Sequence, residues 1–301
     1  MSTVLVSPKK VIGQVAQSIP QRCRGNIVIV GSLAVGYHLL PDDDRHPVRT
    51  KDIDCVLSPR IVAVSRSQEI VQELIDAGWT HRSEGEFGNP GTTLTPTHLL
   101  PAIRLYPPDP QGWWLEFLTE PELHMQGGRN FQRVTLSSGD FGIPSFPYTS
   151  LAVFKPVPSD YGVYIARPEM MALANMLEHQ TIRPDAIKGL YLTNREVKRS
   201  NKDLGRALAI AWLSEEESLD NWPPIWREGL ESCFPDRWRA LAAVAGNGIR
   251  ALIENREDMQ QATDTCTTGL LSGRNVDLTN LEATAERVLI FAVGPLEKMA
   301  T

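Results

Sequence analysis

Apolar residues follow two different periods along the first half of the chain. A β-branched run at residues 26–30 and an alternating acidic and apolar run at 52–57 predict two strands. Helical spacing predicts helices at 10–19, 33–40 and 61–77. Apolar runs at 102–106 and 113–118, separated by turn-forming residues, predict a hairpin, and we expect further strands at 133–136, 151–155 and 162–165. The first half therefore alternates strands with helices.

The pattern changes to a helical one at Pro168. Helices are expected at 169–178, 184–191, 195–213, 224–232, 235–253 and 281–291. Residues 255–280 are polar and rich in threonine, which predicts a loop. The chain is thus expected to form an α/β domain over residues 1–167 and an α-helical domain over 168–301.

Composition and charge narrow the functional classes. The 301 residues are 42% hydrophobic and 22% charged, which is typical of a globular protein with a substantial core. The net charge of -6 argues against a protein that coats nucleic acid, although a local basic face is compatible with it. The four cysteines form no Cys-x-x-Cys pair, so we expect free thiols in a reducing compartment. With neither a signal-peptide pattern nor a membrane-spanning apolar run, the expected location is the cytoplasm.

The strongest chemical signal is the carboxylate pair Asp52 and Asp54 in the second predicted strand. Side chains two residues apart on a strand point to the same face, so both should project together while Ile53 enters the core. Two carboxylates on one face repel each other unless a cation lies between them. An oxygen-only ligand set is what Mg²⁺ prefers, with Mn²⁺ as an alternative. The pair therefore predicts a divalent-metal site.

Gly31 and Ser32 lie where the first strand passes into a helix. A glycine at such a turn allows a phosphate to approach the backbone, and the helix start offers unpaired N–H groups. The hydroxyl of Ser32 can add a hydrogen bond. A phosphate cradle beside a carboxylate pair is what phosphoryl or nucleotidyl transfer requires.

Glu116 is the candidate third carboxylate, because it stands among apolar neighbours in a predicted strand. It would serve as metal ligand and as general base for an incoming hydroxyl. Two other interpretations stay open, a solvent-facing strand residue and an ion pair with Arg104 across the hairpin.

The segments Gly31-Ser32-Leu33-Ala34-Val35 and Arg49-Thr50-Lys51-Asp52-Ile53-Asp54 resemble the DNA polymerase β-type nucleotidyltransferase superfamily. More narrowly, they are similar to bacterial nucleotidyltransferase-like proteins that include AbiEii-type toxins. The resemblance implies a mixed-sheet core and an enzyme that uses an NTP with Mg²⁺ or Mn²⁺. It also implies the site residues: Gly31 and Ser32 at the triphosphate, Asp52, Asp54 and Glu116 at the metal, and Lys188 or Lys202 at the nucleotide or acceptor.

The resulting hypothesis is transfer of a nucleotidyl group from an NTP to an acceptor hydroxyl, with tRNA or another RNA as one acceptor. Protein AMPylation and adenylylation of a small molecule are rivals within the same chemistry. A different class of rival is a non-catalytic nucleotide-binding protein or a member of a toxin–antitoxin pair with an antitoxin partner.

The basic residues near the proposed site each have two interpretations. Arg49 either contacts phosphate or structures its loop. The residues around Lys188 and Lys202 form either a solvated helix face or a basic wall for triphosphate or RNA. Asp203 is expected to position Lys202 or to pair with Arg199 or Arg206.

Overall fold

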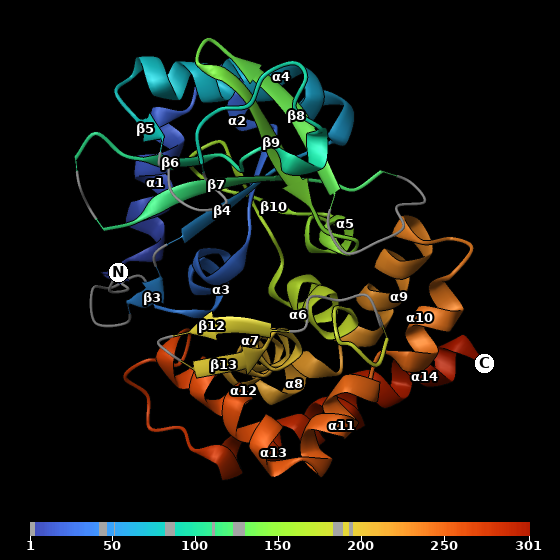
Figure 1. The fold of residues 1–301 in the computed structure, drawn as a ribbon. Coiled ribbons are helices and arrows are strands. Elements are labelled where there is room, and N and C mark those ends of the chain that lie inside the picture. The colour runs from blue at the N-terminus through green and yellow to red at the C-terminus, as the bar shows by residue number, and fades with distance from the viewer. Residues whose placement is uncertain are drawn as a thin grey trace. The chain divides into compact units, whose positions relative to one another are not determined.

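The computed structural model describes residues 4–41, 47–50, 52–81, 88–109, 112–122, 130–182, 189–192 and 195–301. The chain divides into two compact units (Figure 1). The first unit is drawn from Met1–Tyr37 and Pro41–Ala166, and the second from His38–Leu40 and Arg167–Thr301. The assignment of residues 1–167 and 168–301 to two domains stays a prediction.

A seven-stranded sheet forms the centre of the first unit. Its strands are, in spatial order, β10 (Val157–Pro158), β11 (Tyr164–Ile165), β2 (Ile27–Ile29), β4 (Asp52–Leu57), β7 (Trp114–Thr119), β6 (Arg104–Tyr106) and β5 (Thr80–His81). The pairs β11–β2 and β4–β7 are parallel and the other neighbours are antiparallel. The sheet is therefore mixed, and the α/β fold class is confirmed. The predicted hairpin is confirmed as the antiparallel pair β6–β7.

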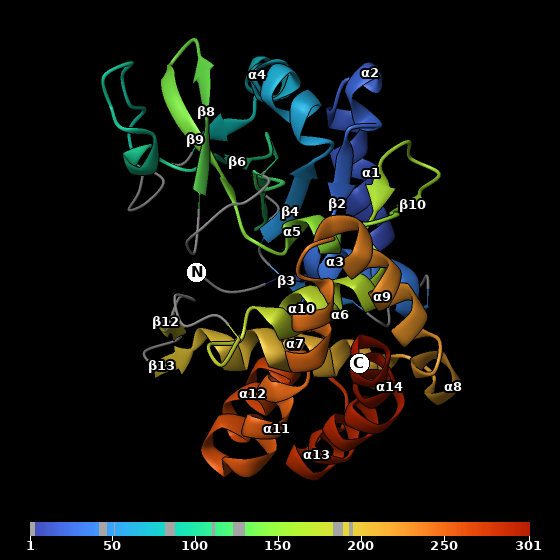
Figure 2. The same cartoon turned by 90° about the vertical axis from the view of Figure 1, so that its right-hand side faces the viewer.

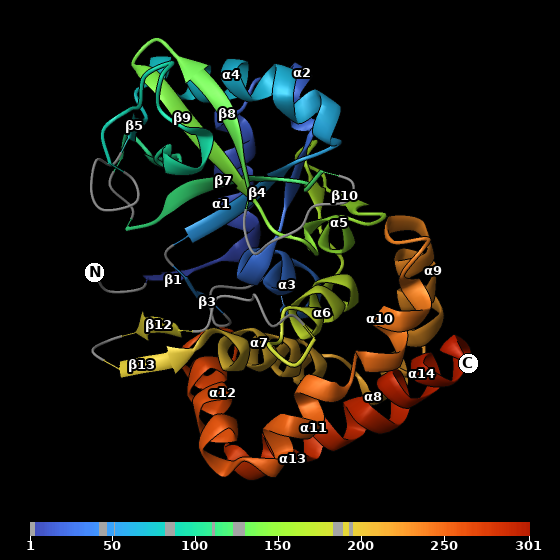
Figure 3. The same cartoon turned by 45° about the vertical axis from the view of Figure 1, so that its right-hand side comes forward.

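Helices and two smaller strand pairs complete this unit. The helices are α1 (Pro8–Ser18), α2 (Gln21–Arg24), α3 (Gly31–Leu39), α4 (Arg60–Asp76) and α5 (Thr149–Ala152), with a 3₁₀ turn at Thr97–Leu99. The strand pairs are β1 (Val4–Val6) with β3 (Val48–Thr50) and β8 (Asn130–Leu136) with β9 (Gly139–Ser145). Figure 3 shows the β8–β9 hairpin beside α4, where Gln72 Oε1 accepts hydrogen bonds from the amide and hydroxyl of Ser137 at 3.2 and 3.0 Å.

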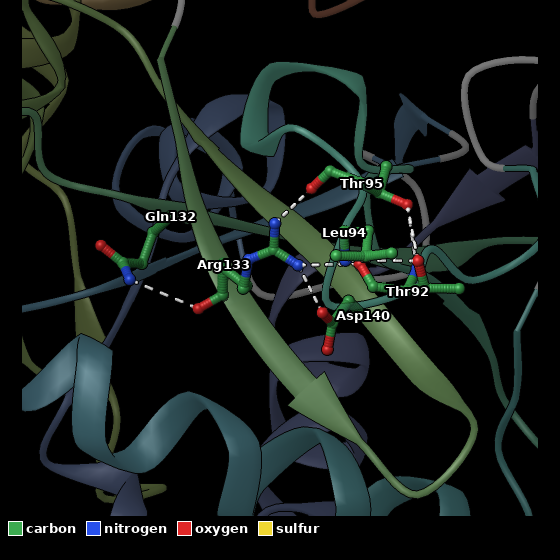
Figure 4. A network of polar contacts seen from close by, with 6 residues as sticks. All are labelled: Thr92, Leu94, Thr95, Gln132, Arg133 and Asp140. Carbon is green, nitrogen blue, oxygen red and sulfur yellow. Dashed lines mark hydrogen bonds and ion pairs between the residues drawn. The ribbon is translucent and has the colours of Figure 1, made fainter.

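Arg133 of β8 ties the segment before the 3₁₀ turn to the hairpin (Figure 4). Its guanidinium forms an ion pair with Asp140 of β9 and donates hydrogen bonds to the carbonyl oxygens of Thr92, at 3.1 Å, and Thr95. Asp140 is 2% exposed, so this pairing supplies the counter-charge that a buried carboxylate needs.

The second unit is largely helical. Its helices are α6 (Pro168–Leu177), α7 (Arg199–Leu213), α8 (Glu216–Leu219), α9 (Trp222–Cys233), α10 (Trp238–Val244), α11 (Asn247–Glu254), α12 (Arg256–Thr268), α13 (Leu278–Arg287) and α14 (Gly294–Ala300), with a π-helical turn at Val288–Val293. Figure 2 shows α7 packed beside α12. A short hairpin joins β12 (Gly189–Leu192) to β13 (Arg195–Lys198). Within the described part of the chain, none of the helices has the length and apolar character needed to cross a bilayer.

The β12–β13 hairpin corrects the sequence prediction. The helix expected at 184–191 is wrong at 189–191, which belong to β12, and its first five residues lie outside the described residues. The helix expected to begin at residue 195 begins at Arg199, because residues 195–198 pair with β12. Four-residue segments are too short for periodicity to separate strand from helix.

The loop predicted at 255–280 is wrong at 256–268 and at 278–280, which are helical, whereas residues 269–277 contain neither helix nor strand, as predicted. Residues 256–268 form α12, which begins after Asn255, whose side chain accepts hydrogen bonds from the amides of Glu257 and Asp258. Met259, Ala262 and Cys266 supply a buried stripe at helical spacing. The hydroxyls of Thr263, Thr265 and Thr267 in α12 donate hydrogen bonds to carbonyl oxygens of the preceding turn. A polar composition is therefore compatible with a helix here.

Two further predictions differ from the structure. The strand expected at 151–155 is replaced by the short helix α5, in which Leu151 is fully buried. The helix expected at 235–253 is two helices, α10 and α11, separated at Ala245 and Gly246. An apolar run at 151–153 is compatible with a buried strand or a buried helix, and only its packing decides.

Candidate functional site

Three carboxylates gather on one face of the central sheet. Asp52, Asp54 and Glu116 each offer an oxygen, and these oxygens lie within 4.8 Å of one another. All three side chains are partly exposed. Because β4 and β7 are parallel neighbours, Asp54 stands directly opposite Glu116 in the register. The residues proposed from the sequence as metal ligands therefore lie together.

Strand alternation explains this clustering. On β4, Ile53 is 1% exposed and Cys55 is fully buried, so the intervening aspartates project to the other face. On β7, Leu115 and Phe117 are fully buried and flank Glu116. Burial of the apolar residues fixes which face carries the acids, since a one-residue slip would reverse every side chain.

Gly31 begins α3, with one residue between it and the end of β2, and lies against Asp54. Its φ of +74° falls in the left-handed region, which favours glycine. A β-carbon at this position would lie 3.0 Å from Oδ2 of Asp54. The amide of Val30 donates to the carbonyl oxygen of Asp54 at 3.0 Å, which holds the turn to β4. Ser32 follows in the first turn of α3 and is half-buried.

Thr50 positions the first aspartate and was not singled out from the sequence. Its hydroxyl lies 3.1 Å from Oδ1 and 3.0 Å from the carbonyl oxygen of Asp52. The side chain of Thr50 is 6% exposed, at the end of β3. Threonine hydroxyls can hydrogen-bond to backbone groups two residues away, so this contact is local in the sequence.

Glu116 is both a member of the carboxylate cluster and the partner of Arg104. Arg104 of β6 stands opposite Glu116 in the antiparallel register, and its Nη2 forms an ion pair with Oε1. The indole Nε1–H of Trp114 donates to the same oxygen at 2.8 Å. The ion pair between Arg104 and Glu116, which the sequence left open as an alternative, is therefore present. Glu116 also lies with Asp52 and Asp54, as the metal-site hypothesis requires.

The donor set fits a hard divalent cation. All three side chains offer carboxylate oxygens, which suit Mg²⁺ and Mn²⁺, so the cluster could hold a metal ion. Burial raises the pKa of the neighbouring Cys55 thiol, and the charge of Asp54 raises this pKa further. Cys55 therefore stays a protonated thiol on the opposite face and adds no soft ligand to the site.

The strand pairing that brings the three carboxylates together does not determine the positions of the basic residues proposed to bind nucleotide. Arg49 is exposed on β3, and alternation directs it to the opposite side of that strand from Thr50. Lys202 is half-buried on α7 of the second unit, and Lys188 lies outside the described residues. A nucleotide-binding role for Arg49, Lys188 or Lys202 stays a prediction.

Asp203 of α7 is 2% exposed and pairs with basic residues of its own helix. Nε of Arg199 donates to Oδ2 at 2.8 Å, and Nη1 of Arg206 lies 4.0 Å from Oδ1. The predicted pairing of Asp203 is confirmed. Two of the cations in this basic segment are thus partly neutralised by an acid on the same helix.

No protein-family model matches the chain, and no curated protein matches its sequence. Among solved structures, the chain is similar to a STING-associated CdnE c-di-GMP synthase from Capnocytophaga granulosa. The match has 8% sequence identity and a TM-score of 0.23, and it covers 97% of this chain and 81% of the other.

Proposed function

We propose that this protein transfers a nucleotidyl group from an NTP to an acceptor hydroxyl in a reaction that depends on Mg²⁺ or Mn²⁺. One observation carries the proposal. The oxygens of Asp52, Asp54 and Glu116 lie within 4.8 Å of one another, and the glycine that begins α3 stands against one of these carboxylates. A metal-binding acid cluster beside a helix start provides for both the cation and the phosphates of an NTP.

The chain's own residues have separate tasks in this reaction. Asp52, Asp54 and Glu116 would hold the cation, which supplies charge neutralisation for the triphosphate. Gly31 and Ser32 would bind phosphate oxygens through backbone N–H groups and the serine hydroxyl. The acceptor oxygen forms a bond to the α-phosphorus, the bond to the bridging oxygen of pyrophosphate breaks, and the hydroxyl proton passes to a carboxylate or to water.

For the acceptor we propose an RNA 3′ hydroxyl, with tRNA first. The support is the basic character of α7, where Arg199, Lys202 and Arg206 recur on successive turns. Lys202 and Lys188 are proposed to contact the nucleotide or the acceptor, and Arg49 a phosphate. Protein hydroxyls and small molecules are the alternative acceptors within the same chemistry.

The test is incubation of the full chain with each α-³²P-labelled NTP and Mg²⁺ or Mn²⁺, in the presence of total RNA, lysate protein or a small-molecule extract. Label is expected in RNA, and the fraction that becomes labelled identifies the acceptor. Asp54→Asn should abolish incorporation. The matched control is Asp76→Asn, which neutralises an exposed carboxylate at the end of α4 and should leave incorporation unchanged.

Two results would decide against the proposal. NTP binding that persists without incorporation into any fraction would favour a non-catalytic nucleotide-binding or toxin–antitoxin interaction protein. Incorporation that is equal in the wild type and in Asp54→Asn would show that the acid cluster does not carry the activity.

A further inference from the structure

The third carboxylate of the site is held through one of its two oxygens. Oε1 of Glu116 accepts the indole N–H of Trp114 at 2.8 Å and ion-pairs with Arg104. A carboxylate oxygen has about two lone-pair directions, and these two donors use both. Oε2 is therefore the oxygen that Glu116 can offer to a cation.

The arrangement extends over three neighbouring strands. The registers place Asp54 of β4 opposite Glu116 of β7, and Glu116 opposite Arg104 of β6. Two residue pairs along the same register, Asp52 stands opposite Trp114. The guanidinium carbon of Arg104 lies 4.4 Å from the centroid of the Trp114 ring, so a cation–π contact adds to the ion pair.

Arg104 brings a fixed positive charge to the acid face. The Arg104 and Glu116 side chains are 14% and 21% exposed, so water screens their interaction only in part. Asp52, Asp54 and Glu116 carry three negative charges when ionised, and Arg104 offsets one of them. A divalent cation in the cluster therefore meets one fixed repulsive charge as well as three attractive ones.

We propose, on the basis of the proposed metal site, that Arg104 is a positioning residue. With Trp114 it fixes Glu116 through Oε1, so that this residue binds the ion through Oε2 alone. The positive charge of Arg104 repels the cation, so this arrangement also lowers the affinity of the site for the ion. The planar guanidinium suits this task, since it bonds the carboxylate edge while its face contacts the indole.

The first test is titration of the full chain with Mn²⁺ by electron paramagnetic resonance, in the absence of nucleotide and acceptor. Arg104→Gln should bind Mn²⁺ about tenfold more tightly than the wild type, because a unit charge a few ångströms from the ion is removed. Arg104→Lys keeps the charge and should stay within about twofold of the wild type. The control Arg22→Gln removes an ion-paired arginine of α2, which pairs with Glu69 and Glu73, and should leave the affinity unchanged.

A structural role alone would leave Mn²⁺ affinity unchanged or weaken it in Arg104→Gln, and either result overturns the proposal. Glu116→Gln separates this outcome from failure of the metal site. If Glu116→Gln weakens Mn²⁺ binding while Arg104→Gln has no effect, the role of Arg104 is refuted and the metal site stands. If Glu116→Gln leaves the affinity unchanged, Glu116 is not a ligand, and the metal site fails together with the inference about Arg104.

A second measurement uses the wild type and does not depend on the folding of Arg104 variants. In ¹⁵N-labelled protein titrated with Mg²⁺, the indole N–H signal of Trp114 should shift as the ion binds, because its acceptor is Glu116. Trp114→Phe assigns the signal. Trp226, whose indole donates to the carbonyl oxygen of Glu169 at 2.8 Å, provides the control signal and should not move. A Trp114 signal that stays fixed while Mg²⁺ binds would overturn the proposal.

Discussion

Gly31 and Asp54 approach so closely that a β-carbon on residue 31 would lie 3.0 Å from Oδ2 of Asp54. That separation is too short for an ordinary contact between a carbon atom and an oxygen atom. Gly31 also has a φ of +74°, where an L side chain is strained. A glycine at position 31 therefore allows the backbone conformation of the turn and also leaves space for the carboxylate of Asp54.

Gly31→Ala should lower both stability and metal affinity. The left-handed φ predicts a loss of about 1–2 kcal/mol in the free energy of unfolding. Because Oδ2 of Asp54 must also move, Mn²⁺ binding should weaken several-fold, on the order of 1 kcal/mol. Urea unfolding and Mn²⁺ titration measure the two effects.

Gly273→Ala is the matched control for backbone strain. Its φ is +78°, and a β-carbon there would meet nothing within 4 Å. It should lose stability to a similar degree and keep the wild-type Mn²⁺ affinity. Equal Mn²⁺ affinities in the two variants would show that the close approach to Asp54 has no bearing on the ion.

Thr50→Val tests the support of Asp52. The substitution removes the hydroxyl that lies 3.1 Å from Oδ1 and keeps the shape of the side chain. The expected cost in stability is about 1 kcal/mol, the usual net value of one hydrogen bond. Mn²⁺ affinity should also fall, because Asp52 loses a contact that fixes its rotamer. Denaturant unfolding and Mn²⁺ titration provide the readouts.

Thr119→Val is the corresponding control on β7, the strand that pairs with β4. Thr119 is 2% exposed, and its hydroxyl has no hydrogen-bond partner among the residues that the structure describes. Its replacement should be neutral or stabilising, because a buried hydroxyl without a partner costs free energy. If Thr50→Val were as harmless as Thr119→Val, the bond to Asp52 would contribute nothing.

Divalent cations should stabilise the folded protein through the acid cluster. An ion that binds only the folded state adds about 2.7 kcal/mol when its concentration is one hundred times the dissociation constant. Mg²⁺ should therefore raise the melting temperature, and EDTA should reverse the change. Asp54→Asn should lose this shift, while Asp76→Asn should keep it. A full Mg²⁺ shift in Asp54→Asn would place the stabilising ion elsewhere.

The parts of the site that could be predicted from the sequence are those that depend on neighbours along the chain. Alternation on one strand is a local property, so Asp52 and Asp54 could be assigned to one face from the burial expected of Ile53. Glu116 was identified in the same way, from its apolar neighbours. The mixed α/β core followed from the same strand and helix patterns.

The role of Arg104 could not be predicted in this way, because it depends on which strands become neighbours. Arg104 was weighed only as one possible partner of Glu116. Its ion pair requires the β7–β6 register, and the meeting of Glu116 with Asp54 requires the parallel pairing of β4 with β7. Trp114 lies two residues from Glu116 on the same strand, so alternation places both on one face, but the sequence does not show that the indole bonds the carboxylate. Segments far apart in sequence come together only through the packed sheet.

Below neutral pH, the stability of the protein is expected to fall because of His179, a buried histidine of the second unit. Burial lowers the pKa of His179, which is 4% exposed; the charge of Lys198 lowers it further and that of Asp258 raises it. Nδ1 of His179 accepts the amide N–H of Thr181 at 3.2 Å, so the folded state holds the neutral ring.

The sign of the effect follows from this lowered pKa. Above a pH of about 6.5 the ring is neutral in both states and stability does not depend on it. As the pH falls below that value, the unfolded state binds protons first and the folded state loses stability. The decrease ends only below the lowered pKa of the folded protein. Urea unfolding between about pH 5.5 and pH 8, where most carboxylates remain ionised, should show this decline.

His179→Gln should flatten the decline, because its amide oxygen can accept the Thr181 N–H without titrating. The variant loses some stability at every pH, so the comparison concerns the slope and not the absolute free energy. His98→Gln, at an exposed position in the 3₁₀ turn, should keep the wild-type slope. The buried histidine would be excluded as the cause if both variants declined as steeply as the wild type, since the protons would then bind elsewhere in the unfolded chain.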